Sequence, residues 1–142
     1  MSTIKALPYW FLLIFLSSFF GSCQSQESRQ SSDNVIINQA LTASEFKDKL
    51  EASTNAQLID VRTPGEYKQG HLAEAKLINV RDANFKNNIQ NLNKEEPVFV
   101  YCKVGGRSSK AASILKDMGF KEVYDMKGGI IDWIKKGNEV VK

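Results

Sequence analysis

One short segment of the chain, residues 98–108, combines residue types that could carry out nucleophilic chemistry. The β-branched and aromatic run Val98–Tyr101 predicts a buried strand, and Cys102 stands at its end. Two glycines follow, and then Arg107 and Ser108, where we expect a helix to begin with Ser108 as its cap. A cysteine at that position lies near backbone N–H groups and the positive end of a helix dipole, and both favour the thiolate. The sequence therefore predicts a reactive cysteine.

The residues that follow Cys102 have the composition of an anion-binding loop. Glycines allow the tight curvature that turns several amides inward, and a lysine and an arginine add positive charge. The expected loop residues are Lys103, Val104, Gly105, Gly106, Arg107 and Ser108. The only histidine, His71, is distant in sequence, so unless the fold brings it near, activation must come from amides, dipole and cations. We expect no metal site, because the chain has too few cysteines and histidines for four zinc ligands.

The elements that must position this loop alternate between strands and helices. Hydrophobic patterns predict strands at 35–37, 57–61, 76–80, 98–101 and 121–124, with helices that begin near Thr42, Pro64, Asn84, Ser108 and Gly129. Such alternation is typical of an α/β domain with a mostly parallel sheet that is covered on both faces. In these sheets ligands bind beyond the carboxyl ends of the strands, which is where Cys102 is expected.

Two further groups of residues surround the expected site. Asp60 and Arg62 end the second predicted strand, and we interpret them as supporting residues that form an ion pair beside the loop. Glu66, Tyr67 and His71 are interpreted as scaffold. For Arg107 two roles stay open: a structural clamp on the loop, or a contact with substrate.

Three segments together resemble the signatures of rhodanese-like domains. Residues 102–108 resemble that family's active-site loop, residues 60–67 with Gly70-His71-Leu72 its upstream signature, and residues 128–130 with Trp133 its closing one. The resemblance implies a three-layer α/β/α domain over residues 35–142 that acts as a sulfurtransferase without a cofactor. Cys102 would take a sulfane sulfur from a small anionic donor such as thiosulfate, hold it as a persulfide, and pass it to a thiol or cyanide acceptor. Lys103 stands where many members have arginine, so donor contacts differ there.

Two other functions compete with sulfur transfer. Phosphatases and arsenate reductases of the same fold have five residues between cysteine and arginine, whereas Cys102 and Arg107 are separated by four, which favours the smaller sulfur chemistry. A non-catalytic binding module is the second alternative, and the presence of both residues argues against it. The physiological donor and acceptor do not follow from the sequence, and we expect a monomer.

The N-terminal residues predict export to the cell envelope. Lys5, the apolar run 9–20 and Gly21-Ser22-Cys23 resemble a bacterial lipoprotein signal. The apolar run rises only about 18 Å as a helix, too short for the roughly 30 Å core of a bilayer. We therefore expect a signal peptide at 1–22, and a lipidated Cys23 that anchors the protein to the inner or outer membrane, on the periplasmic side.

Composition is consistent with that organisation. Residues 24–34 contain no apolar side chain, so residues 23–34 are expected to be the lipidated cysteine and a flexible polar tether. The formal net charge of the chain is +3, one unit of which is Lys5, and no block of basic residues is present. This excludes nucleic acid as an expected partner.

Overall fold

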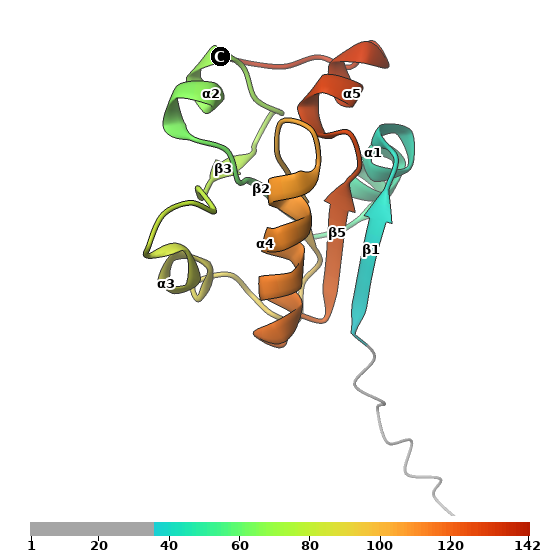
Figure 1. Cartoon of the computed structure of the whole chain (residues 1–142). Coiled ribbons are helices and arrows are strands. Elements are labelled where there is room, and N and C mark those ends of the chain that lie inside the picture. Colours follow the sequence, from blue (N-terminus) through green and yellow to red (C-terminus); the bar gives the residue numbers. More distant parts are fainter. Residues whose placement is uncertain (1–35) are drawn as a thin grey trace, which may run out of the picture. The chain divides into compact units, whose positions relative to one another are not determined.

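The computed structural model of the protein describes residues 36–142 (Figure 1). The predicted signal peptide at 1–22, the lipidated Cys23 and the tether at 23–34 all lie outside the described residues. Within the described part, no helix is both long enough and apolar enough to cross a membrane.

A five-stranded sheet forms the centre of the domain, in the order β1-β5-β4-β2-β3, and every neighbouring pair of strands is parallel. The central strand β4 is buried at all of its positions. This confirms the predicted mostly parallel sheet, in which a strand covered on both faces is a continuous apolar run. The strands are β1 (Ile37–Leu41), β2 (Gln57–Asp60), β3 (Lys76–Leu77), β4 (Val98–Tyr101) and β5 (Glu122–Met126).

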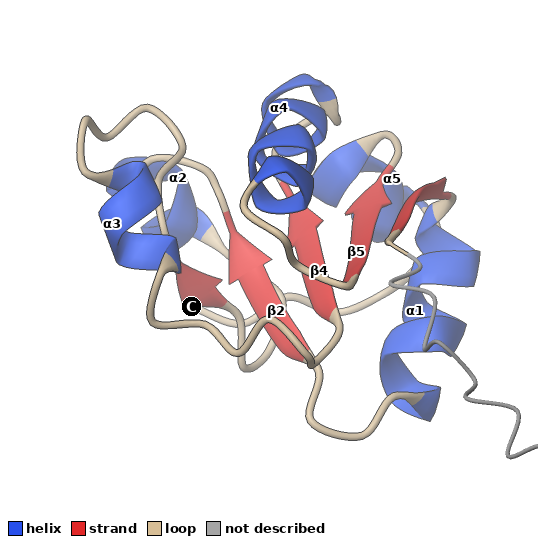
Figure 2. Cartoon of the chain, turned by 90° about the horizontal axis from the view of Figure 1, so that it is seen from below, coloured by secondary structure: helices blue, strands red, loops and turns tan. Residues whose placement is uncertain are grey.

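Helices cover both faces of the sheet and complete three layers (Figure 2). One apolar cluster packs α3 and α4 against one face, and a second packs α1 and α5 against the other. The fold is therefore the α/β/α sandwich that the sequence predicts. The helices are α1 (Ala43–Ala52), α2 (Pro64–Gln69), α3 (Phe85–Ile89), α4 (Gly106–Asp117) and α5 (Gly129–Lys135).

Capping boxes fix where two of the helices begin. The Thr42 hydroxyl accepts from the Glu45 amide at 3.3 Å, and the Glu45 carboxylate accepts from the Thr42 amide at 2.8 Å. Thr63 and Glu66 repeat the arrangement at the start of α2. The first box confirms the predicted start of α1. Each box satisfies backbone donors that a helix start otherwise leaves unpaired.

The predicted cap of α4 is wrong. The helix begins at Gly106 with Gly105 as its cap, so Ser108 lies inside the first turn. The Ser108 side chain is fully buried, and its hydroxyl donates to the Gly105 carbonyl at 2.9 Å. The loop is shorter than predicted because the chain turns into the helix at Gly105. Gly105 has a positive φ, which glycine adopts without strain.

Several elements have boundaries that differ from the predicted ones. β1 extends to Leu41 rather than ending at residue 37, β5 extends to Met126, and α3 is a short helix over Phe85–Ile89 in an asparagine-rich stretch. β3 is two residues long, and the next hydrogen bond to β2 runs from the Ile78 amide to the Asp60 carbonyl. β3 lies at the edge of the sheet and pairs only with β2. Its apolar residues can therefore be buried without a longer run of strand hydrogen bonds.

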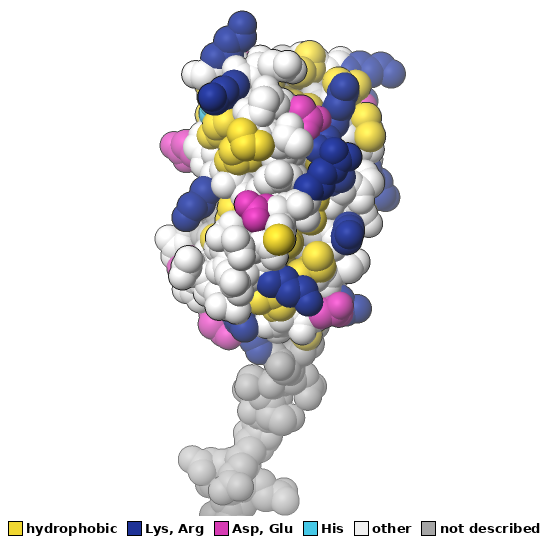
Figure 3. Space-filling model, turned by 60° about the vertical axis from the view of Figure 1, so that its left-hand side comes forward, with side chains coloured by type: hydrophobic (Ala, Val, Ile, Leu, Met, Phe, Trp, Pro, Cys, Tyr) yellow, Lys and Arg dark blue, Asp and Glu magenta, His cyan; other side chains and the backbone are white. Residues whose placement is uncertain are grey.

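The surface of the domain carries charges of both signs. On the face in Figure 3, basic side chains are interspersed with acidic and hydrophobic ones. This mixture matches the small net charge of the chain.

Candidate active site

Cys102 follows β4 directly, at the carboxyl edge of the sheet, and its side chain is buried. The sulfur accepts a hydrogen bond from the Gly105 amide at 3.1 Å. The Ser108 hydroxyl lies 3.5 Å from the sulfur and shares its single proton between the sulfur and the Gly105 carbonyl. Burial by itself raises the pKa of the Cys102 thiol. The hydrogen bonds from Ser108, Val104 and Gly105 outweigh burial, so the pKa is lowered overall. The loop thus favours the thiolate, and Cys102 is a free thiol among the described residues.

Helix α5 holds the other side of the loop. The Ile130 amide donates to the Cys102 carbonyl at 2.9 Å, and the Ile131 amide donates to the Lys103 carbonyl at 3.3 Å. The approach is so close that a Cβ on Gly129 would lie 2.4 Å from the Cys102 carbonyl oxygen. Glycine is therefore required at position 129, and α5 and the cysteine loop are fixed in register with each other.

Asp60 and Arg62 form the predicted ion pair, and it is buried. The guanidinium donates to both Asp60 oxygens, with a shortest contact of 2.6 Å, and to the Gly70 carbonyl at 2.7 Å. Burial would lower the pKa of Arg62, but the bonds to Asp60 outweigh burial and raise it. The pair ties the end of β2 to the end of α2, next to the loop.

A second ion pair joins the cysteine loop to α2. Arg107 donates to the two carboxylate oxygens of Glu66 at 2.7 and 2.6 Å, a bidentate arrangement. These bonds hold the pKa of the Glu66 carboxyl far below its usual range. In this structure Arg107 has the geometry of a clamp. Sequence reasoning treated Glu66 only as scaffold; its place in the upstream signature was the one signal that could have linked it to the loop.

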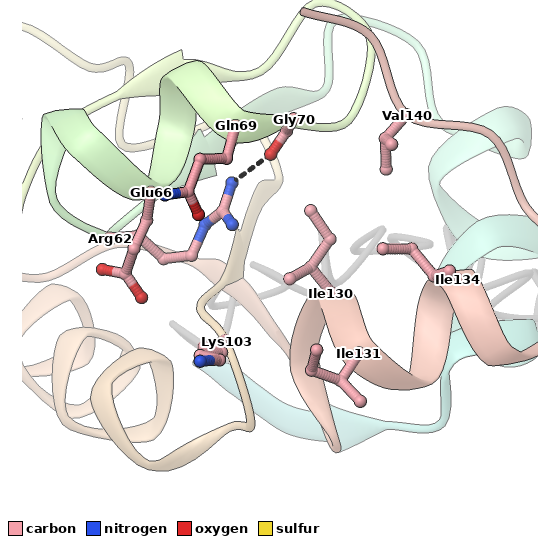
Figure 4. Close-up of a pocket in the computed structure, with 9 residues that line it drawn as sticks. All are labelled: Arg62, Glu66, Gln69, Gly70, Lys103, Ile130, Ile131, Ile134 and Val140. Atoms are coloured by element: carbon pink, nitrogen blue, oxygen red, sulfur yellow. Dashed lines mark hydrogen bonds between the residues drawn. The ribbon is translucent and has the colours of Figure 1, made fainter.

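A cleft of about 190 Å³ opens beside the loop (Figure 4). One wall is polar and comes from residues after β2 and in α2, whereas the opposite wall is apolar and comes from α5 and the C-terminal segment. Lys103 lines the cleft and forms no ion pair within residues 36–142, while Val104 is exposed at the loop. The lining residues are Arg62, Glu66, Gln69, Gly70, Lys103, Ile130, Ile131, Ile134 and Val140.

Two further polar residues, His71 and Asp125, have contacts or burial that set them apart from the loop residues. His71 stacks on Tyr67 with ring centroids 3.7 Å apart, and its backbone pairs with Val141. Within residues 36–142 it makes no hydrogen bond to the Cys102 sulfur, and its role as scaffold stays a prediction. Sequence reasoning missed Asp125, which is 5% exposed on β5 and has one carboxylate oxygen without a partner in the described structure. Burial raises the pKa of Asp125. No acidic, histidine or cysteine cluster among residues 36–142 has the arrangement of a metal site.

Comparison with known proteins identifies the family of this fold. The family model of the rhodanese-like domain matches residues 42–136, which span all three signatures up to Trp133. The chain belongs to the rhodanese-like domain family. Family membership agrees with the resemblance that these three segments show in the sequence.

Individual relatives of this rhodanese-like protein are similar at about one third identity. YqhL of Bacillus subtilis is 36% identical over 97 residues, covering 68% of this chain and 73% of YqhL. A protein of Allochromatium vinosum named sulfurtransferase is 29% identical over 96 residues, covering 68% of this chain and 88% of that protein. The crystal structure of a rhodanese-like domain protein from Staphylococcus aureus aligns with a TM-score of 0.62 at 32% identity, over 73% of this chain and 99% of that one. Of several longer relatives the chain spans about a quarter of the length.

Proposed function

We propose that this protein is a sulfurtransferase that carries sulfur on Cys102. In the first step the thiolate attacks the outer sulfur of a donor such as thiosulfate. The sulfur–sulfur bond of the donor breaks, its electron pair leaves with sulfite, and Cys102 becomes a persulfide. In the second step a thiolate or cyanide attacks the outer sulfur of the persulfide, and the Cys102 thiolate is released. No electrons are gained or lost overall, so the cycle needs no external oxidant or reductant.

The observation that carries this proposal is the place of the Cys102 sulfur, buried at the carboxyl end of β4 with the Gly105 amide 3.1 Å away as a hydrogen-bond donor. Hydrogen-bond donors around the sulfur lower the pKa of the thiol and so favour the thiolate, which is the nucleophilic form. The same donors suit the anionic persulfide that would replace it. A relative that is named sulfurtransferase supports the reaction class.

The cations around the cleft have separate roles in this scheme. Lys103 lines the cleft and has no ion-pair partner in the part of the chain that the structure describes, and it would attract a small anionic donor. Arg107 is engaged by Glu66, so its contribution is to hold the loop amides in position. Lysine is a point charge without a bidentate fork, so we expect it to contribute to donor affinity more than to donor orientation.

Mass spectrometry of the protein after incubation with thiosulfate tests the proposal. We expect one added sulfur on Cys102, released by cyanide as thiocyanate, and neither event in Cys102→Ser. The serine variant is a matched control because its hydroxyl is nearly the size of a thiol but cannot hold sulfane sulfur. Turnover of thiosulfate by a folded Cys102→Ser protein would falsify the mechanism. A wild type that takes no sulfur but hydrolyses an aryl phosphate or reduces arsenate would favour the phosphatase-like alternative, and one that does none of these would favour a binding module.

We also propose that the protein is a lipoprotein anchored through Cys23. In a bacterial host the wild type should fractionate with membranes and incorporate labelled fatty acid, because several acyl chains give stable anchoring. Cys23→Ala should do neither, whereas Ser22→Ala is the control that keeps a small residue before an intact cysteine. Fatty acid incorporated into Cys23→Ala, or an unprocessed soluble wild type, would contradict the anchor.

A further inference from the structure

Asp125 is a buried acid to which the proposed sulfur transfer gives no role. Its side chain is buried, and it forms no ion pair within residues 36–142. One of its two carboxylate oxygens has no hydrogen-bond partner in the described structure. Asp60 is also buried, but Arg62 donates to both of its oxygens. Asp60 therefore has the partner that a buried charge requires, whereas Asp125 does not.

Asp125 lies on the same face of the sheet as Cys102. In the register of β4 with β5 it is opposite Val100, and Cys102 comes two positions after Val100. Val123, two positions before Asp125, packs in the same apolar cluster as Val100 and Cys102, beneath α4. Side chains two positions apart on a strand point to the same face, so Asp125 also lies on the α4 side. The acid and the cysteine are therefore neighbours across two adjacent strands.

Ser108 on α4 connects the two residues. Its hydroxyl lies 3.5 Å from the Cys102 sulfur and 2.9 Å from the Gly105 carbonyl. Burial raises the pKa of the Asp125 carboxyl, and the Ser108 hydroxyl lowers it by a smaller amount, so the hydroxyl acts on the acid as well as on the sulfur. A hydroxyl has one proton to donate and two lone pairs that accept. An ionised Asp125 would compete with the sulfur for the Ser108 proton, whereas a protonated Asp125 can donate to the Ser108 oxygen.

The surroundings of Asp125 favour the protonated form. Lys127, which follows β5, lowers the pKa of the carboxyl, but burial outweighs Lys127 and Ser108 together. The neighbouring elements add no second cation on this face: β1 has no titratable residue, and the buried residues of α4 are uncharged. On β4, Tyr101 packs in the cluster of the opposite face, which leaves the Cys102 thiol as the titratable group on this side. A protonated carboxyl also has an uncharged second oxygen, which costs less to leave unpaired.

We propose that Asp125 is a positioning residue for Cys102: held as a neutral carboxylic acid, it donates its proton to the Ser108 oxygen. The proton of Ser108 is then free for the loop side. There an anionic sulfur outcompetes the neutral Gly105 carbonyl, because hydrogen bonds to a charged acceptor are stronger. Acid, hydroxyl and sulfur form a chain in which each hydrogen bond strengthens the next. This rests on the proposed role of Cys102 as the sulfur carrier and adds a residue that acts on it without touching substrate.

The protonation state of Asp125 can be measured directly by infrared spectroscopy. The difference spectrum between the wild type and Asp125→Asn at neutral pH should contain the carbonyl stretch of one protonated carboxylic acid. Asp48→Asn is the matched control: Asp48 is exposed on α1, so its difference spectrum should show an ionised carboxylate. An ionised carboxylate in the Asp125 spectrum would overturn the proposal. This measurement needs only the conservative variant, so it decides even where a more drastic substitution does not fold.

The effect on the sulfur is measured by iodoacetamide alkylation against pH, followed by mass spectrometry on the peptide that contains Cys102. Asp125→Leu removes the donor and keeps a side chain of similar length, and we expect it to raise the pKa of Cys102 by about half a unit to one unit. Asp125→Asn keeps a neutral donor and should leave that pKa within about 0.2 units of the wild type. In a Ser108→Ala background, Asp125→Leu should add no further shift, because the chain is already broken.

Three results of the alkylation experiment would overturn the proposal. The first is a folded Asp125→Leu protein in which the pKa of Cys102 equals that of the wild type. The second is any clear shift in Asp125→Asn: a rise as large as in Asp125→Leu would exclude the donor, and a fall would mean that Asp125 is ionised. The third is an equal shift by Asp125→Leu with and without the Ser108 hydroxyl. A wild type with the expected alkylation profile that forms no persulfide would instead refute the proposed function and leave the role of Asp125 standing.

Discussion

Two ion pairs lie along the same cleft and differ in almost every physical respect. Asp60 and Arg62 are two residues apart, and their side chains are 0% and 6% exposed. Glu66 and Arg107 are separated by 41 positions in the chain, and their side chains are 25% and 20% exposed. The first pair is a local feature of the end of β2. The second joins α2 to the loop that carries Cys102.

The difference indicates two distinct uses of charge. Taking a carboxylate and a guanidinium fully out of water is costly, so Asp60 and Arg62 depend on each other, and removing one leaves the other unpaired. A pair that keeps some contact with water contributes little to folding, but its geometry still holds the loop in place. We therefore expect the buried pair to govern stability and the half-buried pair to govern activity.

The largest effect should come from Arg62→Met, which breaks the buried pair while keeping the length of the side chain. We expect the free energy of unfolding to fall by about 3–5 kcal/mol, because Asp60 is left as an unpaired buried charge. Urea denaturation followed by tryptophan fluorescence measures it. The double variant Asp60→Leu with Arg62→Met should recover part of the loss, since it leaves no buried charge. A loss well under about 1 kcal/mol in the single variant would mean that water reaches Asp60.

Arg107→Lys should change activity much more than stability. The free energy of unfolding should change by no more than about 1 kcal/mol, because the pair is partly solvated. The value of kcat/KM for thiosulfate should fall on the order of tenfold to a hundredfold, because lysine cannot reproduce the two-bond clamp and the loop amides shift. Arg81→Lys, an exposed arginine outside the cleft, is the control. Equal kcat/KM in Arg107→Lys and Arg81→Lys would show that Arg107 does not position the loop.

The smallest effect is the pH dependence of the second pair. Arg107 lowers the pKa of the Glu66 carboxyl below its ordinary value of 4.5, so the pair stabilises the fold above that pH. The contribution is lost as the pH falls from 4.5 toward the lowered value, because the unfolded chain takes up the proton first. The free energy of unfolding of the wild type, measured by urea denaturation, should exceed that of Glu66→Gln by about 1 kcal/mol at neutral pH. The difference should be smaller in acid. Glutamine preserves the capping box, so a gap that does not shrink in acid would point to a cause other than charge.

Local features of the chain were predictable because they depend on near neighbours in sequence. The capping box at Thr42, the strand Val98–Tyr101 and the pair of Asp60 with Arg62 are confirmed by the structure. Each rests on interactions within about one helical turn or one strand. The sheet class was also predictable, since alternating strands and helices leave few other arrangements.

Features that depend on distant contacts were not predictable in the same way. The bond between Glu66 and Arg107 requires α2 and the loop to meet, which no periodicity encodes. Ser108 was assigned as a cap because its residue type suits one, but the structure buries it beneath the sulfur. Asp125 occupies an ordinary position in a strand pattern, and the structure buries it on β5, the strand against which α4 packs. The catalytic roles assigned from the sequence remain predictions.

The glycines of the site differ in how much substitution they allow. An added Cβ at Gly106 would meet no other atom within 4 Å, whereas at Gly129 it would collide with the backbone on either side of the peptide bond after Cys102. In a saturation library, position 106 should therefore accept alanine in the folded protein, while position 129 should be intolerant of every replacement. The two glycines thus differ in how strongly the fold requires them. A search for distant homologues would gain discrimination by weighting the second above the first.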